Sequence, residues 1–248
     1  MLTVKELSKS FNGKSVLEKV SLEVGKGDVI VILGPSGSGK TTFLRSLNHL
    51  EKADSGILEL EGKTYDLAKI GRKDVLELRQ KTAFVFQHYN LFANKTALEN
   101  ILEGLVIARK IPKSEAEKIA LEALEKVGLL SHKDYYPNQL SGGQQQRIGI
   151  ARAIAVKPEL ILFDEPTSAL DPELIGDVLG VMKQLAEEGV TMIVVTHEMG
   201  FARKVSHRVI FMDVGGKILE DCSRDEFFGN PDGRQPRTKD FLNKILNH

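Results

Sequence analysis

The feature that most constrains this chain is a glycine-rich segment, Gly34–Thr42, which reads GPSGSGKTT. It matches the pattern G-x-x-x-x-G-K-[ST] and lies between an apolar, β-branched run, 28–33, and a segment of helical character, 42–47. A strand, such a loop and a helix form a phosphate cradle, because glycines let backbone N–H groups point inward and the helix adds its positive dipole end. A glycine-rich turn that binds nothing is the alternative, and the flanking elements argue against it. The sequence therefore predicts a nucleotide site.

Two residues of this segment have specific predicted roles. Lys40 is long enough to reach the β- and γ-phosphates, and the Thr41 hydroxyl can bind Mg²⁺. Contact with the nucleotide is predicted for the whole segment, which comprises Gly34, Pro35, Ser36, Gly37, Ser38, Gly39, Lys40, Thr41 and Thr42.

The composition narrows the class of protein. Of the 248 residues, 42% are hydrophobic and 27% are charged, which is enough apolar mass for a core. The 34 Lys and Arg residues balance 34 Asp and Glu residues, which gives no sign of a nucleic-acid partner. Cys222 is the only cysteine, so no disulfide forms within the chain. No apolar run reaches the roughly 20 residues of a bilayer span, so we expect a cytosolic protein. Such a protein could still work at a membrane by docking onto a protein that spans it.

The order of apolar runs indicates an α/β architecture with a helical insertion. Strands are predicted at 2–7, 20–24, 28–33, 56–62, 83–86, 160–163, 191–195, 208–213 and 217–220. Helices are predicted at 42–47, 96–110, 114–127, 145–156, 171–187 and 236–246, and Ser114–Glu117 matches a capping box, S-x-x-E. Only helices are expected in 88–157, and the alternation of strands and helices resumes from Glu159.

Two carboxylates follow the buried strand at 160–163. Asp164 and Glu165 would stand at its C-terminal end, the edge at which ligands bind in open α/β sheets. Asp164 can hold Mg²⁺ opposite Thr41, and Glu165 is the better candidate to polarise an attacking water. A strand end that merely meets solvent is the alternative, to which we give little weight.

Gln87 and His197 also follow predicted strands. The amide oxygen of Gln87 could bind Mg²⁺ or a water, and His197 could contact a γ-phosphate and orient the water. Each residue alone would more often be an ordinary loop residue. Their position at the same sheet edge as the phosphate loop favours a role in the site.

A second glycine-rich loop, Leu140–Gln144, leads into the helix predicted at 145–156. A second anion site at this helix N-terminus is one interpretation. A plain helix cap, with Ser141 as the N-cap residue, is the other. The residues alone do not decide between them.

Together these motifs resemble the nucleotide-binding subunit of an ATP-binding cassette (ABC) transporter over essentially the whole chain. The pair LSGGQ at 140–144 and DEPT at 164–167, separated by about 20 residues, is very specific to that family. The resemblance makes Gly34–Thr42 the Walker A loop, Gln87 the Q-loop, Leu140–Gln144 the signature, Leu160–Glu165 the Walker B strand with its catalytic acid, Ser168–Asp171 the D-loop and His197 the switch histidine. The resemblance also implies a P-loop NTPase core with an N-terminal antiparallel β-subdomain, formed by 1–87 and 158–248, and an inserted helical signature subdomain, 88–157, in one domain of 1–248.

What the resemblance implies about activity is ATP hydrolysis with Mg²⁺. Glu165, His197 and Gln87 would be catalytic, and Thr41, Gln87 and Asp164 would hold the metal. Phe11 stands where an aromatic ring stacks on adenine, and Val16 is assigned to the same site; on residue type alone, Phe11 could equally cap the edge of the core. Ser141, Gly142, Gly143 and Gln144 would contact the nucleotide of a second copy in a head-to-tail homodimer.

The resemblance further implies that the chain drives a transmembrane permease at the cytoplasmic face of the cell membrane, with a solute-binding protein as an indirect partner. Segments 86–92, 96–100, 197–202 and 235–242 are similar to those of polar amino-acid importers, and the cystine-type branch is the most similar. An exporter of lipid or lipoprotein type and a non-transport ABC protein remain as alternatives, because these motifs serve all three.

Overall fold

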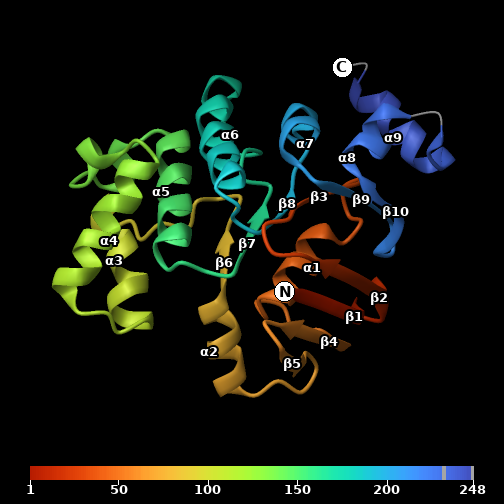
Figure 1. Cartoon of the computed structure of the whole chain (residues 1–248), viewed down its shortest axis with the longest axis horizontal. Coiled ribbons are helices and arrows are strands. Elements are labelled where there is room, and N and C mark those ends of the chain that lie inside the picture. Colours follow the sequence, from red (N-terminus) through yellow and green to blue (C-terminus); the bar gives the residue numbers. More distant parts are fainter. Residues whose placement is uncertain (231–232, 247–248) are drawn as a thin grey trace.

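The structure, a computed structural model, describes residues 1–230 and 233–246. It contains two β-sheets, a helical region to one side and a helical C-terminal end (Figure 1). The strands are β1 (Leu2–Phe11), β2 (Lys14–Val24), β3 (Val29–Leu33), β4 (Ser55–Leu60), β5 (Lys63–Asp66), β6 (Thr82–Val85), β7 (Leu160–Asp164), β8 (Met192–Val195), β9 (Arg208–Asp213) and β10 (Lys217–Ser223). The α-helices are α1 (Lys40–Leu47), α2 (Arg72–Lys81), α3 (Ala97–Glu103), α4 (Lys113–Lys126), α5 (Gly142–Ala155), α6 (Pro172–Glu187), α7 (Met199–Val205), α8 (Arg224–Gly229) and α9 (Pro236–Leu246).

The larger sheet has six strands in the order β10-β9-β3-β8-β7-β6. β9, β3, β8, β7 and β6 run parallel, and β10 pairs antiparallel with β9 at the edge. Every residue of β3, β7 and β8 is buried, as expected for parallel strands covered on both faces. In β3, Val29, Val31 and Leu33 face one core cluster, while Ile30 and Ile32 face the other. The sheet therefore separates two hydrophobic cores.

The smaller sheet is antiparallel, in the order β2-β1-β4-β5, and it packs its apolar face into the second core with α1. Its first hairpin turns at Asn12 and Gly13, both with positive φ. The strands predicted at 2–7 and 20–24 extend as β1 and β2 to this turn, so the predicted N-terminal antiparallel unit is confirmed and its strands are longer than expected.

Between β6 and β7 the chain forms only helices and turns, and α3, α4 and α5 gather at the left of Figure 1. The helix predicted at 96–110 is α3 followed by a π-helical turn, Gly104–Ala108. Two short 3₁₀ helices, Leu130–His132 and Pro137–Gln139, also lie in this region.

The capping box predicted at Ser114 is wrong. Helix α4 begins one residue earlier and has Pro112 as its N-cap, so Ser114 lies inside the first turn. Proline fixes φ near the helical value and lacks an N–H, which suits it to a helix start. Thr96 and Glu99 instead form a capping box at the start of α3.

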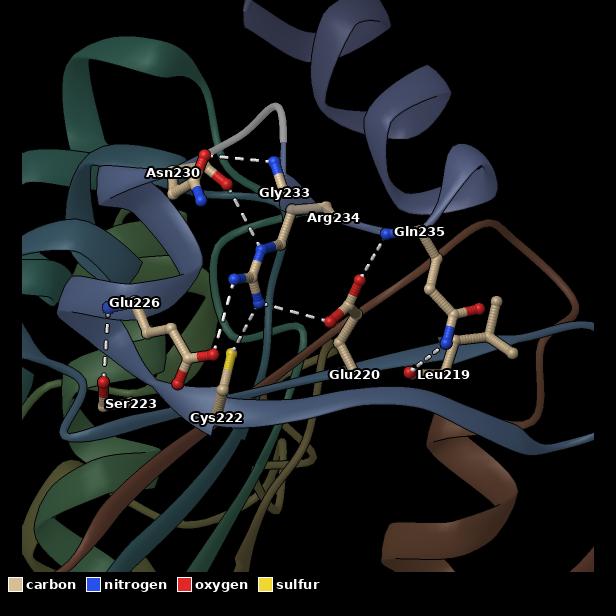
Figure 2. Close-up of polar contacts among 9 residues, drawn as sticks. All are labelled: Leu219, Glu220, Cys222, Ser223, Glu226, Asn230, Gly233, Arg234 and Gln235. Carbon is tan, nitrogen blue, oxygen red and sulfur yellow. Dashed lines mark hydrogen bonds and ion pairs between the residues drawn. The ribbon is translucent and has the colours of Figure 1, made fainter.

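The C-terminal segment is attached to β10 and α8 through Arg234, whose side chain is 8% exposed (Figure 2). Its guanidinium donates to Glu220 at 3.2 Å, to the Cys222 Sγ at 3.2 Å and to Glu226 at 3.4 Å. The Gln235 N–H also donates to Glu220, at 2.7 Å. One buried arginine thus links the start of α9 to the edge of the larger sheet. Within 1–230 and 233–246, no helix has both the length and the apolar character needed to cross a bilayer.

Candidate functional site

The phosphate loop lies between β3 and α1 at the C-terminal edge of the larger sheet. Gly34, Gly37 and Gly39 have φ values of 148°, 78° and 97°, in the left-handed region that favours glycine. A Cβ at Gly34 would lie 2.0 Å from the Met212 carbonyl oxygen, and one at Gly39 would lie 2.8 Å from that of Val16. Backbone from β9 and β2 therefore encloses the loop, and only glycine fits at these two positions.

Lys40, the first residue of α1, is 5% exposed. Its Nζ donates to the carbonyl oxygens of Gly34 and Pro35 at 2.8 and 2.9 Å, so the amine is folded back over the loop. Burial lowers the pKa of Lys40, and the carboxylates of Glu165 and Asp164 act in the opposite direction. Because its hydrogen-bond acceptors are neutral oxygens, the ammonium group is suited to a phosphate anion.

Thr41 and Asp164 meet across the space between α1 and β7. The Thr41 hydroxyl donates to Asp164 Oδ1 at 2.7 Å, and the Asp164 side chain is 3% exposed. Burial raises the pKa of Asp164, although the Thr41 hydrogen bond and Arg45 lower it. A hydroxyl oxygen and a carboxylate oxygen at this distance are hard donors of the kind that Mg²⁺ takes, so these residues fit that ion.

Arg45 was not predicted as part of the site, yet its Nη2 lies 3.6 Å from Asp164 Oδ2. It follows Thr41 by four residues in α1, and residues at this spacing share one face of a helix. That spacing was the signal that could have identified it.

Glu165 and His197 form a pair at the ends of β7 and β8. His197 Nε2 lies 3.2 Å from Glu165 Oε1, and the side chains are 41% and 22% exposed, respectively. The hydrogen bond from His197 lowers the pKa of Glu165, against a rise from burial. Glu165 also has a φ of 46°, a strained value for a residue with a side chain. The pair thus presents an ionised carboxylate to solvent at neutral pH.

An open cavity of about 360 Å³ joins these groups to the first hairpin. Its lining residues are Phe11, Val16, Ser36, Gly37, Gly39, Lys40, Thr41, Thr42 and Glu165. Phe11 is 41% exposed and belongs to neither core cluster, so it does not cap the core. Lys9 Nζ lies 4.6 Å from the centre of its ring. An aromatic face and a phosphate loop at two sides of one cavity suit a nucleotide.

Gln87 follows β6, which pairs with β7 in a register that sets Val85 beside Phe163. Gln87 is therefore level with Glu165 at the same sheet edge, as the sequence predicts, but it does not line the cavity. Its contact with a bound metal stays a prediction.

The second glycine-rich loop, Leu140–Gln144, lies at the start of α5 and away from the cavity of the phosphate loop. Ser141 is the N-cap of α5: its hydroxyl accepts from the Gln144 N–H at 3.2 Å, and the Gln144 side chain accepts from the Ser141 N–H at 2.9 Å. Ser141 is exposed, whereas Gly143 is buried with its Cα facing Leu174. The plain-cap interpretation thus describes the isolated chain, and none of residues 141–144 lines the cavity of the phosphate loop. Their contact with a nucleotide stays a prediction.

Comparison with known proteins identifies the family. The model of the ABC transporter family matches residues 17–168. A probable amino-acid ABC transporter ATP-binding protein of Haemophilus influenzae is 55% identical over 245 residues, 98% of this chain and 94% of the relative. An L-cystine import ATP-binding protein of Bacillus subtilis is 55% identical over 248 residues, covering 100% and 99%. A glutamine transport ATP-binding protein of the same species is 49% identical, with full coverage of both chains.

Among solved structures, a dimeric ATP-binding cassette in a post-hydrolysis state with ADP and Pi matches with a TM-score of 0.79 and 34% identity, over 90% of this chain and 99% of that chain. The fold class predicted from the sequence is thereby confirmed. The chain belongs to the ABC transporter family, as an ATP-binding cassette of that family.

Proposed function

We propose that this chain binds and hydrolyses ATP to power an importer of polar amino acids. The observation that carries the proposal is that Lys40, Thr41 and Glu165 line one open cavity. Behind them, Asp164 is hydrogen-bonded to Thr41 and His197 to Glu165. A phosphate ligand, a metal site and an ionised general base are the parts that phosphoryl transfer to water needs. Relatives named for L-cystine, glutamine and glutamate transport support the class of cargo.

The chain's own residues divide the work in the following way. The glycine-rich loop and Lys40 bind the phosphates. Phe11 and Val16 contact the adenine ring of the nucleotide. Thr41, Asp164 and Gln87 hold Mg²⁺, which neutralises charge on the phosphate oxygens when bound. Glu165, kept ionised by His197, accepts the proton of the attacking water, while His197 faces the terminal phosphate.

Assembly completes the proposed site. In a head-to-tail homodimer, Ser141–Gln144 of one copy would meet the terminal phosphate held by the phosphate loop of the other. The exposed Ser141 and the dimeric form of the matching cassette support this arrangement. Hydrolysis would remove the phosphate that joins the copies, and the closing and opening would drive a permease at the cytoplasmic membrane face. A solute-binding protein would deliver the cargo.

We also propose that the chain divides functionally into a core, 1–87 and 158–248, and a signature subdomain, 88–157. The absence of strands from the described residues between β6 and β7 supports this division. The core would hold the nucleotide, and the helical part would present Ser141–Gln144 to the other copy.

Glu165→Gln tests the hydrolytic proposal. The variant keeps the size of the side chain and removes the base, so it should bind Mg-ATP, dimerise with it and turn over at least about 100-fold more slowly. Size-exclusion chromatography with light scattering and phosphate release are the measurements. Near-normal turnover would exclude Glu165 from this role. Uptake of labelled cystine and glutamine by vesicles that hold the complete complex identifies the cargo, and export in place of uptake would overturn the importer assignment.

A further inference from the structure

We propose that Tyr89 is a positioning residue that ties the loop entering α5 to the loop that follows Glu165, so that the two loops keep a fixed spacing. Tyr89 lies two residues beyond Gln87, in the segment between β6 and α3. Its importance for ATP-driven dimerisation rests on the function proposed above. Its importance for the order of the two loops does not.

The first contact is with the turn after Glu165. The Tyr89 hydroxyl donates to the Ala169 carbonyl oxygen at 3.1 Å. Ser168, the residue before Ala169, bonds back to the Glu165 carbonyl oxygen through its N–H at 3.2 Å and through its hydroxyl at 3.0 Å. The Tyr89 hydroxyl therefore holds the same turn that carries Glu165.

The second contact is with the start of α5. A Cβ built on Gly142 would lie 2.6 Å from the Tyr89 hydroxyl oxygen and 3.4 Å from the ring carbon that bears it. It would also lie 3.1 Å from a methyl carbon of Leu170, in the same turn as Ala169. Tyr89 and this turn therefore pack directly on the N-terminus of α5 and leave little room for a side chain at position 142. The hydroxyl occupies the junction between the two loops.

The backbone of Tyr89 is itself held by α5. Tyr89 and Asn90 have φ values of 47° and 50°, and two consecutive residues with side chains in this region are strained. Arg152 donates to the Tyr89 and Asn90 carbonyl oxygens at 3.3 and 2.8 Å, and Gln146 donates to the Phe86 carbonyl oxygen at 3.0 Å. Helix α5 therefore fixes the position of the Tyr89 backbone. The hydrogen bond from the Tyr89 hydroxyl in turn fixes the position of Ala169 relative to α5.

The hydroxyl remains a donor at neutral pH. Burial raises the pKa of Tyr89, and the nearby carboxylate of Asp171 raises it further. A neutral phenol can donate to a carbonyl oxygen, whereas a phenolate cannot.

The first experiment uses the nucleotide-free chain and Tyr89→Phe, which removes only the hydroxyl. Loss of this hydrogen bond should accelerate amide hydrogen exchange about fivefold in both 142–146 and 168–171, measured by mass spectrometry. Tyr135→Phe is the matched control, because Tyr135 is 43% exposed in the same helical region and should change neither segment. Acceleration in one segment only, or in neither, would overturn the proposal.

The second experiment exploits the crowding at Gly142. In the Glu165→Gln chain with Tyr89 intact, Gly142→Ala should weaken ATP-driven dimerisation. Adding Tyr89→Phe should partly restore dimerisation, because the hydroxyl oxygen at 2.6 Å is then gone and the nearest Tyr89 atom to the new methyl group is a ring carbon at 3.4 Å. Tyr89→Phe alone should weaken dimerisation about fivefold at unchanged ATP affinity of the monomer. Additive effects of the two substitutions would contradict the proposed contact.

These two readouts separate the inference from the proposed function. If the Glu165→Gln chain with Tyr89 intact fails to dimerise with ATP, the proposed dimer fails, and the exchange experiment still decides the role of Tyr89. If that chain dimerises and Tyr89→Phe changes neither dimerisation nor exchange, only the role of Tyr89 fails.

Discussion

The two glycine-rich loops of this chain enter helices in similar ways but end differently. The loop before α1 ends at Gly39, which has a φ of 97°, offers no side-chain cap and is followed by no acidic residue in the first turn. The loop before α5 ends at Ser141, whose hydroxyl and backbone form a reciprocal capping box with Gln144. One helix start is left open, and the other is closed by its own side chains.

The difference indicates when each loop needs an anion. Free N–H groups and a dipole at the start of α1, beside a buried ammonium, remain uncompensated until a phosphate arrives. The start of α5 is already satisfied, so the isolated chain loses little when no anion is there. This contrast agrees with a loop that binds its own nucleotide and another that meets a nucleotide only during dimer closure.

The largest effect should come from Gly39→Ala. Left-handed backbone costs a residue with a Cβ about 1–2 kcal/mol, and overlap with the Val16 carbonyl oxygen adds roughly 1–3 kcal/mol. Thermal unfolding should show a Tm lower by about 5–15 °C, with loss of ATP binding. Gly37→Ala is the control, because its φ is 78° but no atom lies within 4 Å of the added Cβ. Equal losses in both variants would refute the close approach at Gly39.

Lys40→Ala should cost about 3 kcal/mol of nucleotide binding, or roughly 100-fold in affinity, because charge-assisted bonds to phosphate are lost. The stability of the nucleotide-free chain should hold or rise, because the substitution removes a buried ammonium. Titration with a fluorescent ATP analogue and thermal unfolding measure the two effects. Lys69→Ala, at a side chain that is 83% exposed, should change neither. An unchanged affinity for Lys40→Ala would show that α1 is not the phosphate site.

Asp164→Asn should stabilise the nucleotide-free chain by roughly 0.5–2 kcal/mol at pH 7 while it abolishes Mg-dependent turnover. Because the folded pKa of Asp164 lies above its ordinary value of 3.8, folding disfavours the ionised form at neutral pH. As the pH falls through the raised folded pKa towards 3.8, Asp164 becomes protonated and this penalty disappears. The stability advantage of Asp164→Asn should therefore shrink in that pH range. Denaturant unfolding across pH 4 to 8 measures the gain, and a gain that grows in acid would have the wrong sign.

Ser141→Ala should have the smallest effect, about 1 kcal/mol of stability, with unchanged ATP affinity of the monomer. Dimerisation of the Glu165→Gln chain with ATP should weaken as well. Ser223→Ala is a matched control, since Ser223 caps α8 through a 3.2 Å bond from the Glu226 N–H. It should cost similar stability and leave dimerisation unchanged. If both serines affect dimerisation alike, the exposed Ser141 has no role beyond its cap.

Much of the fold could be predicted because its central strands are apolar throughout. β7 and β8 are buried on both faces, so they leave continuous runs, and the predicted 208–213 coincides with β9. The predicted 236–246 likewise coincides with α9. Helix α2 was missed because Leu78 is its only buried residue, and a helix with so narrow an apolar face leaves little periodic signal.

The candidate site was predictable to the extent that it follows from topology. Asp164, Glu165 and His197 gather because parallel strands end at one edge, and their strands were recognisable. The capping state of Ser141 was not, since a cap and an anion site share one sequence pattern. The spacing of Arg45 from Thr41 in α1 gave a local signal. The contact of Tyr89 with Ala169 depends on how distant segments pack, and no local pattern encodes it.

One peptide of β2 lies between two glycines from distant parts of the chain. The carbonyl oxygen of Val16 is 2.8 Å from the Cβ position of Gly39 and 2.6 Å from that of Gly216, in the turn between β9 and β10. With no side chain as a cushion, displacement of this turn would push backbone against backbone. The turn between β9 and β10 and the phosphate loop thus pack against the same peptide of β2, and a shift of one would reach the other through backbone atoms alone.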